Sequence, residues 1–428
     1  MAGSVADAEQ EVSRILDPRY RLPVIGIVAV VTVVAIEAMA VTTVMPTVVR
    51  ALHGLHYYSW GFTAYLLADV VGMVDAGQRS DRDGPTPSLL GGMLLFAAGL
   101  AVAATATDIW MFLVGRVLQG MGGGSLIVAL YVVIARALPT SLHGKAFALT
   151  SAAWVVPSLV GPSLAGLVAS TVGWRWVFGG MVPIALAGVL ILVPCLRDIA
   201  SHEHPSEDET PLPATPAHRS WVAGVQLAIG LGAIQEAAQL AAWWSLPILV
   251  AGCALAGPPL RRLLPTGAFR LSRGLATVIV LRGVLACAFF GAEAYLPLTL
   301  TRLHGGTPRT VGIPLTIASL GWSAGSWWQG RRATGRIGSM QAGFALVAAG
   351  VGLLLFVARP WTSLWLAIPI WSVAGAGIGL VMPLLSVLLL ELSPEEDHGA
   401  NSAALLLSDM TGTIVGIAVI AALVDGLG

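Results

Sequence analysis

Charged side chains inside long apolar runs are the residues of this sequence best placed to do chemistry. Seven of them interrupt such runs: Glu37, Asp69, Arg116, Glu236, Arg282, Glu293 and Asp409. Burial raises the pKa of a carboxylic acid and a neighbouring guanidinium lowers it, so an acid that shares a buried site with arginine can exchange a proton near neutral pH. Ionisable groups are costly inside a bilayer and usually face a cavity or a partner helix. The pattern favours proton-dependent chemistry within a membrane.

Composition indicates a membrane protein. Hydrophobic residues make up 56% of the 428-residue chain and charged residues 11%, whereas soluble domains carry roughly a quarter charged residues. The zero net charge gives no indication of a nucleic-acid partner. The three cysteines lie in apolar runs and form neither a disulfide framework nor a metal cluster. Because no nucleophile–base or metal-ligand spacing occurs, we expect no enzyme activity, no metal and no cofactor.

The apolar runs predict thirteen membrane-spanning helices, and so an all-α polytopic protein. They cover residues 22–49, 58–78, 87–107, 109–138, 144–170, 174–196, 221–240, 243–260, 274–300, 310–330, 338–358, 361–393 and 400–425. With a cytoplasmic N-terminus, sixteen of the 23 basic residues fall on the cytoplasmic side and five on the other. The positive-inside rule therefore predicts that the N-terminus is cytoplasmic.

An internal repeat divides these spans. A shift of 255 residues carries three glycines onto three others: Gly120, Gly122 and Gly124 onto Gly375, Gly377 and Gly379. Nearer the N-terminus a shift of 251 carries Pro46 onto Pro297 and Gly84 onto Gly335. Two similar halves in parallel orientation are a known transporter plan, and chance coincidence in a Gly-rich chain is the alternative.

The repeat predicts four segments along the chain. They are a six-helix N-terminal half (1–196), a cytoplasmic linker (197–220), an inserted helix pair with a cytoplasmic loop (221–271) and a C-terminal half of five helices (272–428). The repeat partner of the sixth helix would fall at about 429–451, so we expect a fourteenth helix to be missing from this sequence.

Five stretches carry a family resemblance. They are Glu37 nine residues before Pro46, the loop Gly77–Gly84, the run Arg116–Gly120, the run Trp154–Gly166 and the run Gly173–Phe178. In this order they resemble the major facilitator superfamily, specifically its fourteen-helix drug:proton antiporter branch. Pro157 stands where the antiporter motif of helix five has a glycine, and Pro85 stands where the loop motif has a basic residue.

The resemblance implies the major facilitator fold, with two pseudo-symmetric six-helix halves and an inserted central pair. It implies proton-coupled export of hydrophobic, cationic or zwitterionic drugs by alternating access, and hence antibiotic resistance. We expect a monomer in a bacterial cytoplasmic (inner) membrane, with lipid, drugs and protons as partners and the proton gradient as the energy source. The alternatives are export of a lipid or other amphipathic metabolite, and a non-transporting membrane scaffold or sensor.

We expect proton coupling to involve five charged residues: Glu37, Arg116, Asp69, Asp409 and Glu293. Glu37 and Arg116 lie at comparable depths when counted at ~1.5 Å per residue, so we expect them to be close enough to couple; a structural polar contact is the alternative. Asp69 is read as a second proton site, a cation-recognition carboxylate or a neutral hydrogen-bonded side chain. Arg282 is expected to extend to the cytoplasmic interface.

Two further groups complete the predicted site. Aromatic and amide side chains could line a substrate cavity, where rings stack on flat or cationic drugs, although some tryptophans mark the membrane interface. The cavity candidates are Tyr65, Gln119, Trp154, Tyr295 and Trp322. Gating is assigned to the loop motif and to the bend in the fifth predicted span. The alternative for the bend is a Gly/Pro kink of the kind that any membrane helix tolerates. The gating candidates are Gly77, Asp81, Arg82, Gly84, Arg136, Pro157, Gly161 and Pro162, with Arg136 as the expected partner of Asp81.

Overall fold

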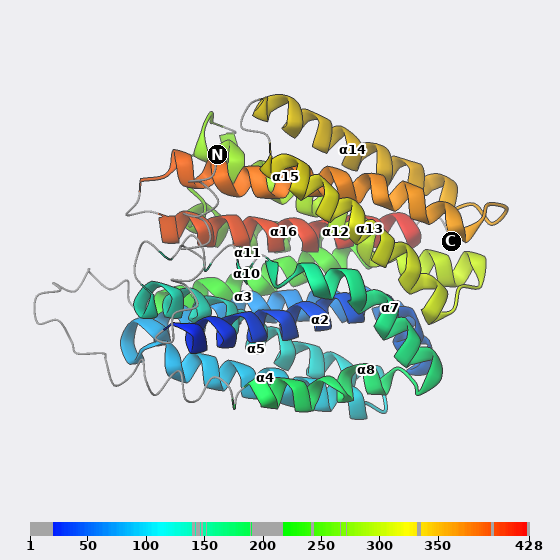
Figure 1. Cartoon of the computed structure of the whole chain (residues 1–428), viewed down its shortest axis with the longest axis horizontal. Coiled ribbons are helices and arrows are strands. Elements are labelled where there is room, and N and C mark those ends of the chain that lie inside the picture. Colours follow the sequence, from blue (N-terminus) through cyan, green and yellow to red (C-terminus); the bar gives the residue numbers. More distant parts are fainter. Residues whose placement is uncertain are drawn as a thin grey trace, which may run out of the picture.

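The computed structural model describes residues 20–138, 142, 146, 149–150, 152–188, 190, 217–240, 244–265, 267–270, 272–331, 335–394 and 398–425. Long helices run side by side along the longest axis of the molecule (Figure 1), and no strand occurs among these residues. The N-terminal helices are α2 (Arg21–Ala51), α3 (Trp60–Asp83), α4 (Pro85–Thr105), α5 (Ile109–Ala137), α7 (Val155–Thr171) and α8 (Arg175–Gly179). The later helices are α10 (Ala217–Gln239), α11 (Ser245–Leu263), α12 (Leu275–His304), α13 (Pro308–Gly330), α14 (Arg336–Val357), α15 (Ala367–Leu392) and α16 (His398–Asp425).

Each of the thirteen predicted spans overlaps one of these helices, and the spans 144–170 and 174–196 extend into residues outside the described part. Seven helices are long and apolar enough to cross a membrane by length and composition, and two shorter apolar helices cover Val155–Thr171 and Arg175–Gly188. The remaining helices, α3, α10, α11 and α13, are less apolar. The prediction of an all-α multi-pass membrane protein is therefore confirmed. The linker at 197–220 lies almost entirely outside the described residues, so the segment boundaries stay predictions.

The repeat seen in the sequence recurs as matching helix contacts. A Cβ on Gly122 of α5 would lie 2.5 Å from the Gly92 carbonyl of α4, and a Cβ on Gly377 of α15 would lie 2.6 Å from the Gly343 carbonyl of α14. These two pairs are related by the shifts of 255 and 251 residues. The glycines let α4–α5 and α14–α15 pack backbone against backbone in the same way.

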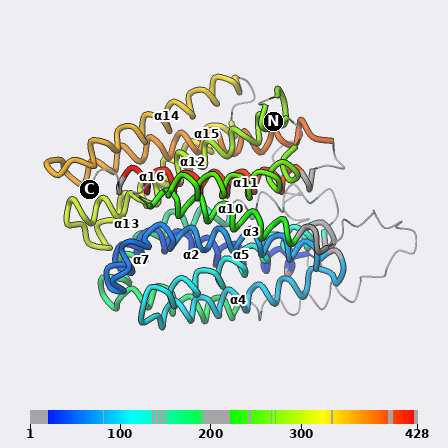
Figure 2. Tube along the Cα trace, turned by 180° about the vertical axis from the view of Figure 1, so that it is seen from behind, coloured from blue at the N-terminus to red at the C-terminus, as the bar shows by residue number. Residues whose placement is uncertain are grey.

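The apolar core is divided in the same manner. One cluster of buried side chains draws mainly on α2, α4 and α5, and a second draws on α12, α13 and α15. A third, smaller cluster contains Val70 of α3, Leu227 and Leu231 of α10, and Leu407 and Ile414 of α16. Helix α10 of the inserted pair therefore packs against both halves, and Figure 2 shows it between them.

The two halves meet at the end of the bundle where α2 ends and α3 begins, which the charge distribution predicts to be the outer end. There the Tyr58 hydroxyl donates to the Ala294 carbonyl of α12, and the Tyr58 and Tyr295 rings lie 5.3 Å apart. The Ser163 and Thr316 hydroxyls of α7 and α13 are 2.7 Å apart. Hydrogen bonds and ring contacts thus join the halves at the predicted outer end.

Candidate functional site

The side chain of Arg116 is the centre of a buried polar site in the N-terminal half. Its guanidinium forms an ion pair with the Glu37 carboxylate of α2, and Nη1 also donates to the Gln119 side-chain oxygen. Nε donates to the Gly61 carbonyl of α3 at 2.8 Å, and the guanidinium carbon lies 4.5 Å from the centre of the Tyr65 ring. Only 4% of the Arg116 side chain and 2% of that of Glu37 are exposed. The structure therefore places Glu37 and Arg116 in contact, as their comparable depths predict.

Helix geometry explains how the site forms. Arg116 and Gln119 are three residues apart on α5, and Gly61 and Tyr65 are four apart on α3, so each pair shares one helix face. Backbone packing at Gly120, whose Cβ would lie 2.9 Å from the Tyr65 carbonyl carbon, brings these two faces together. The second Glu37 oxygen, Oε2, has no hydrogen-bond partner among the described residues. The site can therefore accept one more hydrogen bond or a proton.

Asp69 lies farther along the same face of α3. Its side chain is buried, and neither carboxyl oxygen has a hydrogen-bond partner among the residues that the structure describes. A Cβ on Gly123 of α5 would touch both the Tyr65 hydroxyl and, at 3.2 Å, Asp69 Oδ1. The ring of Tyr65 therefore contacts Arg116 while its hydroxyl lies beside the same glycine as Asp69.

A second, partly buried ion pair lies in the C-terminal half. Arg282 Nε donates to both carboxyl oxygens of Asp409 at 2.7 and 2.8 Å, and Nη1 donates to the Met382 carbonyl and the Ser386 hydroxyl of α15. The expectation that Arg282 extends to the cytoplasmic interface is wrong. Because a Cβ on Gly412 of α16 would lie 3.0 Å from Cα of Gly283, α12 and α16 pack backbone against backbone and bring the two charges together.

We expect Arg282→Ala to lower the free energy of unfolding by about 3 kcal/mol, the lower end of the range for a broken buried pair, because 16% of the Asp409 side chain is exposed. Adding Asp409→Asn should recover part of the loss, since no unpaired charge then remains. Thermal unfolding of the detergent-solubilised protein measures both variants. A double variant less stable than Arg282→Ala would contradict this reading.

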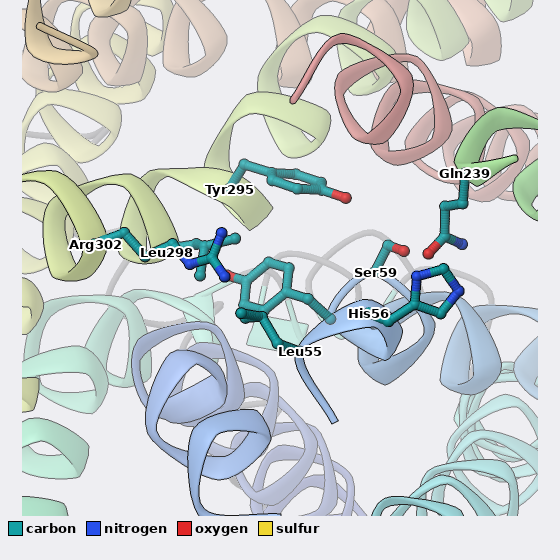
Figure 3. Close-up of a pocket in the computed structure, with 8 residues that line it drawn as sticks. Leu55, His56, Ser59, Gln239, Tyr295, Leu298 and Arg302 are labelled. Atoms are coloured by element: carbon teal, nitrogen blue, oxygen red, sulfur yellow. The ribbon is translucent and has the colours of Figure 1, made fainter. Parts of the chain in front are cut away.

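Tyr295 lies at a cavity of about 220 Å³ at the predicted outer end. Figure 3 shows its ring between Arg302 and Leu298 on one side and Ser59 and Gln239 on the other. This cavity is small and does not include the other predicted cavity residues. Glu293, two residues before Tyr295, is half-buried and has no ion pair among the described residues.

The other cavity candidates lie apart from one another. Tyr65 and Gln119 belong to the Arg116 site. Trp322 of α13 is half-buried, and its ring packs edge-on against that of Phe289 at 5.8 Å. Trp154 precedes α7 and 37% of it is exposed. The structure therefore brings Tyr65 and Gln119 together and leaves the tryptophans at other places.

The loop motif between α3 and α4 and the bend at Gly161 and Pro162, which lies in α7, occupy different parts of the bundle. Gly84 joins α3 to α4 with φ of +76°, a conformation that favours glycine. A Cβ on Gly77 would lie 3.9 Å from the Val128 side chain of α5. Exposed Arg82 bonds to its neighbour Asp83 at 3.3 Å. The side chains of Asp81 and Arg136 lie outside the described residues, so their expected pairing stays a prediction.

Helix α7 contacts both halves through the bend residues. Pro157, Gly161 and Pro162 are all buried. A Cβ on Gly161 would lie 3.0 Å from Met39 of α2, and the Cβ position of Gly312 on α13 lies 2.9 Å from the Pro162 carbonyl carbon. A change in the angle of α7 would therefore alter packing on both sides, which suits the gating role expected for these residues.

Comparison with known proteins gives consistent results. The model of the family described as Major Facilitator Superfamily matches residues 27–417. A probable multidrug-efflux transporter of Mycobacterium tuberculosis is 30% identical over 84% of this chain and 79% of its own length. Multidrug resistance protein 3 of Bacillus subtilis is 23% identical over 85% of this chain and 71% of its own. An uncharacterized MFS-type transporter of M. tuberculosis is 29% identical over 90% of this chain, which spans only 56% of that relative.

Solved structures share the architecture at low sequence identity. A POT family transporter in complex with a thioalcohol-conjugated peptide superposes with a TM-score of 0.65 at 14% identity, over 95% of this chain and 91% of its own. A bacterial homologue of the human lysosomal transporter Spinster, in an inward-facing and unoccupied conformation, gives a TM-score of 0.60 at 16% identity, over 94% and 82%. These similarities show the fold.

Proposed function

This chain belongs to the Major Facilitator Superfamily, and we propose that it exports hydrophobic, cationic or zwitterionic drugs across a bacterial cytoplasmic membrane in exchange for protons. The observation that carries the proposal is the buried ion pair of Glu37 with Arg116. Drug export is supported by the names of relatives in M. tuberculosis and B. subtilis. A cytoplasmic N-terminus, a monomeric state and a part in antibiotic resistance belong to the same proposal.

The ion pair links protonation to helix packing. Glu37 lies on α2, whereas Arg116 lies on α5 and also binds the α3 carbonyl of Gly61. Protonation of Glu37 would remove the negative charge that holds α2 to α5. The buried Arg116 guanidinium would then lack its counter-ion and be more stable in contact with another acceptor. Because α2 also packs against α7 and α12, loss of this contact can change how the two halves meet. Such a change is what alternating access requires.

One relative favours the second candidate function. An MFS-type transporter of the acurin A biosynthesis cluster in Aspergillus aculeatus is 28% identical over 89% of this chain and 71% of its own length. Its name associates it with a biosynthetic product, so the same fold could export an amphipathic metabolite here. Uptake assays with lipophilic cations and with uncharged amphiphiles would separate the two functions. A scaffold or sensor would move neither.

We expect proteoliposomes containing the full chain to couple ethidium movement to proton movement, and we expect Glu37→Gln to abolish that coupling. The amide keeps the shape of the side chain but cannot carry the charge that pairs with Arg116. A pH-sensitive dye inside the vesicles reports the protons. Glu391→Gln is the matched control, because Glu391 is an exposed glutamate paired with Arg336. Unchanged coupling in Glu37→Gln would refute the proposed role of the pair.

A further inference from the structure

The first half holds two buried carboxylic acids near a single arginine. Glu37 is paired with Arg116, and Asp69 is buried without a hydrogen-bond partner for either oxygen among the described residues. An isolated ionised carboxylate is strongly destabilised in a medium of low dielectric constant, so such a group is stable only when it is neutral. Asp69 therefore carries a proton in this conformation, and Glu37 is the ionised acid.

Tyr65 connects the two acids. Its ring lies 4.5 Å from the Arg116 guanidinium, and its hydroxyl lies beside Gly123, where Asp69 Oδ1 is also found. Tyr65 and Asp69 are four residues apart on α3, so the hydroxyl and the carboxyl group share one helix face. A small rotation of either side chain would let the hydroxyl donate to an ionised Asp69. The glycine at position 123 leaves the space that this contact needs.

Two acids on helices that pack against α3 already have partners. On α5 it faces Gly123 and Gly124, and α4 carries no charged residue. Glu236 of α10 accepts a hydrogen bond from Trp60, and Asp409 of α16 pairs with Arg282. Arg116, which is paired with Glu37 and contacts the Tyr65 ring, is therefore the cation that Tyr65 connects to Asp69.

We propose that Glu37 and Asp69 share one exchangeable proton, with Arg116 as their common counter-ion and Tyr65 as the link, and that a singly charged lipophilic cation displaces this proton. With one proton the set of two acids and one arginine is neutral. With none it carries one negative charge, which the cation neutralises. The proton leaves Asp69, no covalent bond to the substrate forms, and charge balances. This inference rests on the proposed function and adds the group that releases the proton and the substrate charge.

The test is the pH dependence of the Kd of tetraphenylphosphonium for the purified full chain in detergent. Displacement of one proton makes the Kd fall about tenfold for each unit of rise in pH, because proton and cation binding are reciprocally linked. We expect this slope in the unaltered protein and in Glu391→Gln. We expect no slope in Asp69→Asn, whose neutral side chain should leave the thermal stability unchanged because it matches the protonated acid in shape.

Three further variants make the proposal falsifiable. Glu37→Gln should also lose the slope, because Asp69 then ionises as the partner of Arg116; a retained slope would show that the proton is not shared. Tyr65→Phe keeps the ring on Arg116 and the one-proton slope but should raise the Kd, because the ionised acid loses a hydrogen-bond donor. Asp69→Glu should restore it if Asp69→Asn fails to bind the cation, and failure to do so would overturn the role of Asp69. Absence of any slope in the unaltered protein would instead refute the proposed function itself.

Discussion

Replacing Arg116 with alanine should lower the free energy of unfolding by about 3–5 kcal/mol, the cost of breaking a buried ion pair from one side. The change leaves the Glu37 carboxylate, 2% exposed, without its partner. It also removes the donors to the Gly61 carbonyl and the Gln119 side-chain oxygen, so α2, α3 and α5 lose the group that joins them. Thermal unfolding of the solubilised protein, followed by tryptophan fluorescence, should show a clearly lower midpoint.

Two variants control for this result. Glu37→Gln combined with Arg116→Gln leaves no buried charge and should lose less stability than Arg116→Ala alone. Arg359→Ala removes an exposed arginine from the loop after α14 and should leave the midpoint unchanged. If Arg116→Ala unfolded at the same temperature as the unaltered protein, the ion pair would contribute nothing to the fold, and its burial would have to serve transport alone.

The sequence predicts the helices of this protein well because the bilayer imposes a simple rule on them. A helix that crosses hydrocarbon needs about twenty apolar residues, and this requirement is visible in the composition of each run. The contact of Glu37 with Arg116 could be predicted for a related reason. Both residues lie in single, uninterrupted spans, so counting residues gives their depth, and few acids are available at that depth.

The pairing of Arg282 with Asp409 could not be predicted in the same way. Contact between them depends on how α12 and α16 are rotated about their axes, which the close approach of Gly283 and Gly412 determines. The repeat gives no help, because its shifts place Val31 and Trp154 opposite the two charged residues. The sequence shows only that each charged residue lies close to one of these glycines: Arg282 is one residue before Gly283, and Asp409 is three before Gly412.

The position of the inserted pair also could not be predicted from the sequence. Helices α10 and α11 have no repeat partner, so symmetry cannot place them. In the structure the polar side chains of α10 bind α3: Trp60 Nε1 donates to Glu236 at 3.0 Å, and the Thr63 hydroxyl donates to Gln235 at 3.2 Å. Apolar side chains of the same helix pack against α16. The inserted helix thus contacts both halves, and only the folded chain reveals this.

Gly122→Ala and Gly377→Ala should each destabilise the protein by about 1–3 kcal/mol, the usual cost of overpacking a close contact. In both cases the new methyl group meets backbone atoms of the neighbouring helix, at 2.5 Å for Gly122 and 2.6 Å for Gly377. Backbone cannot rotate away as a side chain can, so the whole helix must shift. Thermal unfolding measures the loss for each variant.

The double variant tests whether the two contacts act independently, and the two single variants together test whether the halves are equivalent. Gly122 and Gly377 lie in separate clusters of helices and share no neighbour, so their effects should add to about 2–6 kcal/mol. Gly91→Ala on α4 and Gly352→Ala on α14 are the matched controls, because a Cβ at either position meets nothing within 4 Å, and alanine favours the helix. Equal losses at Gly122 and Gly377 would mean that each half depends on the same glycine contact. A loss at only one of them would mean that the repeat is preserved in sequence but not in its contribution to stability.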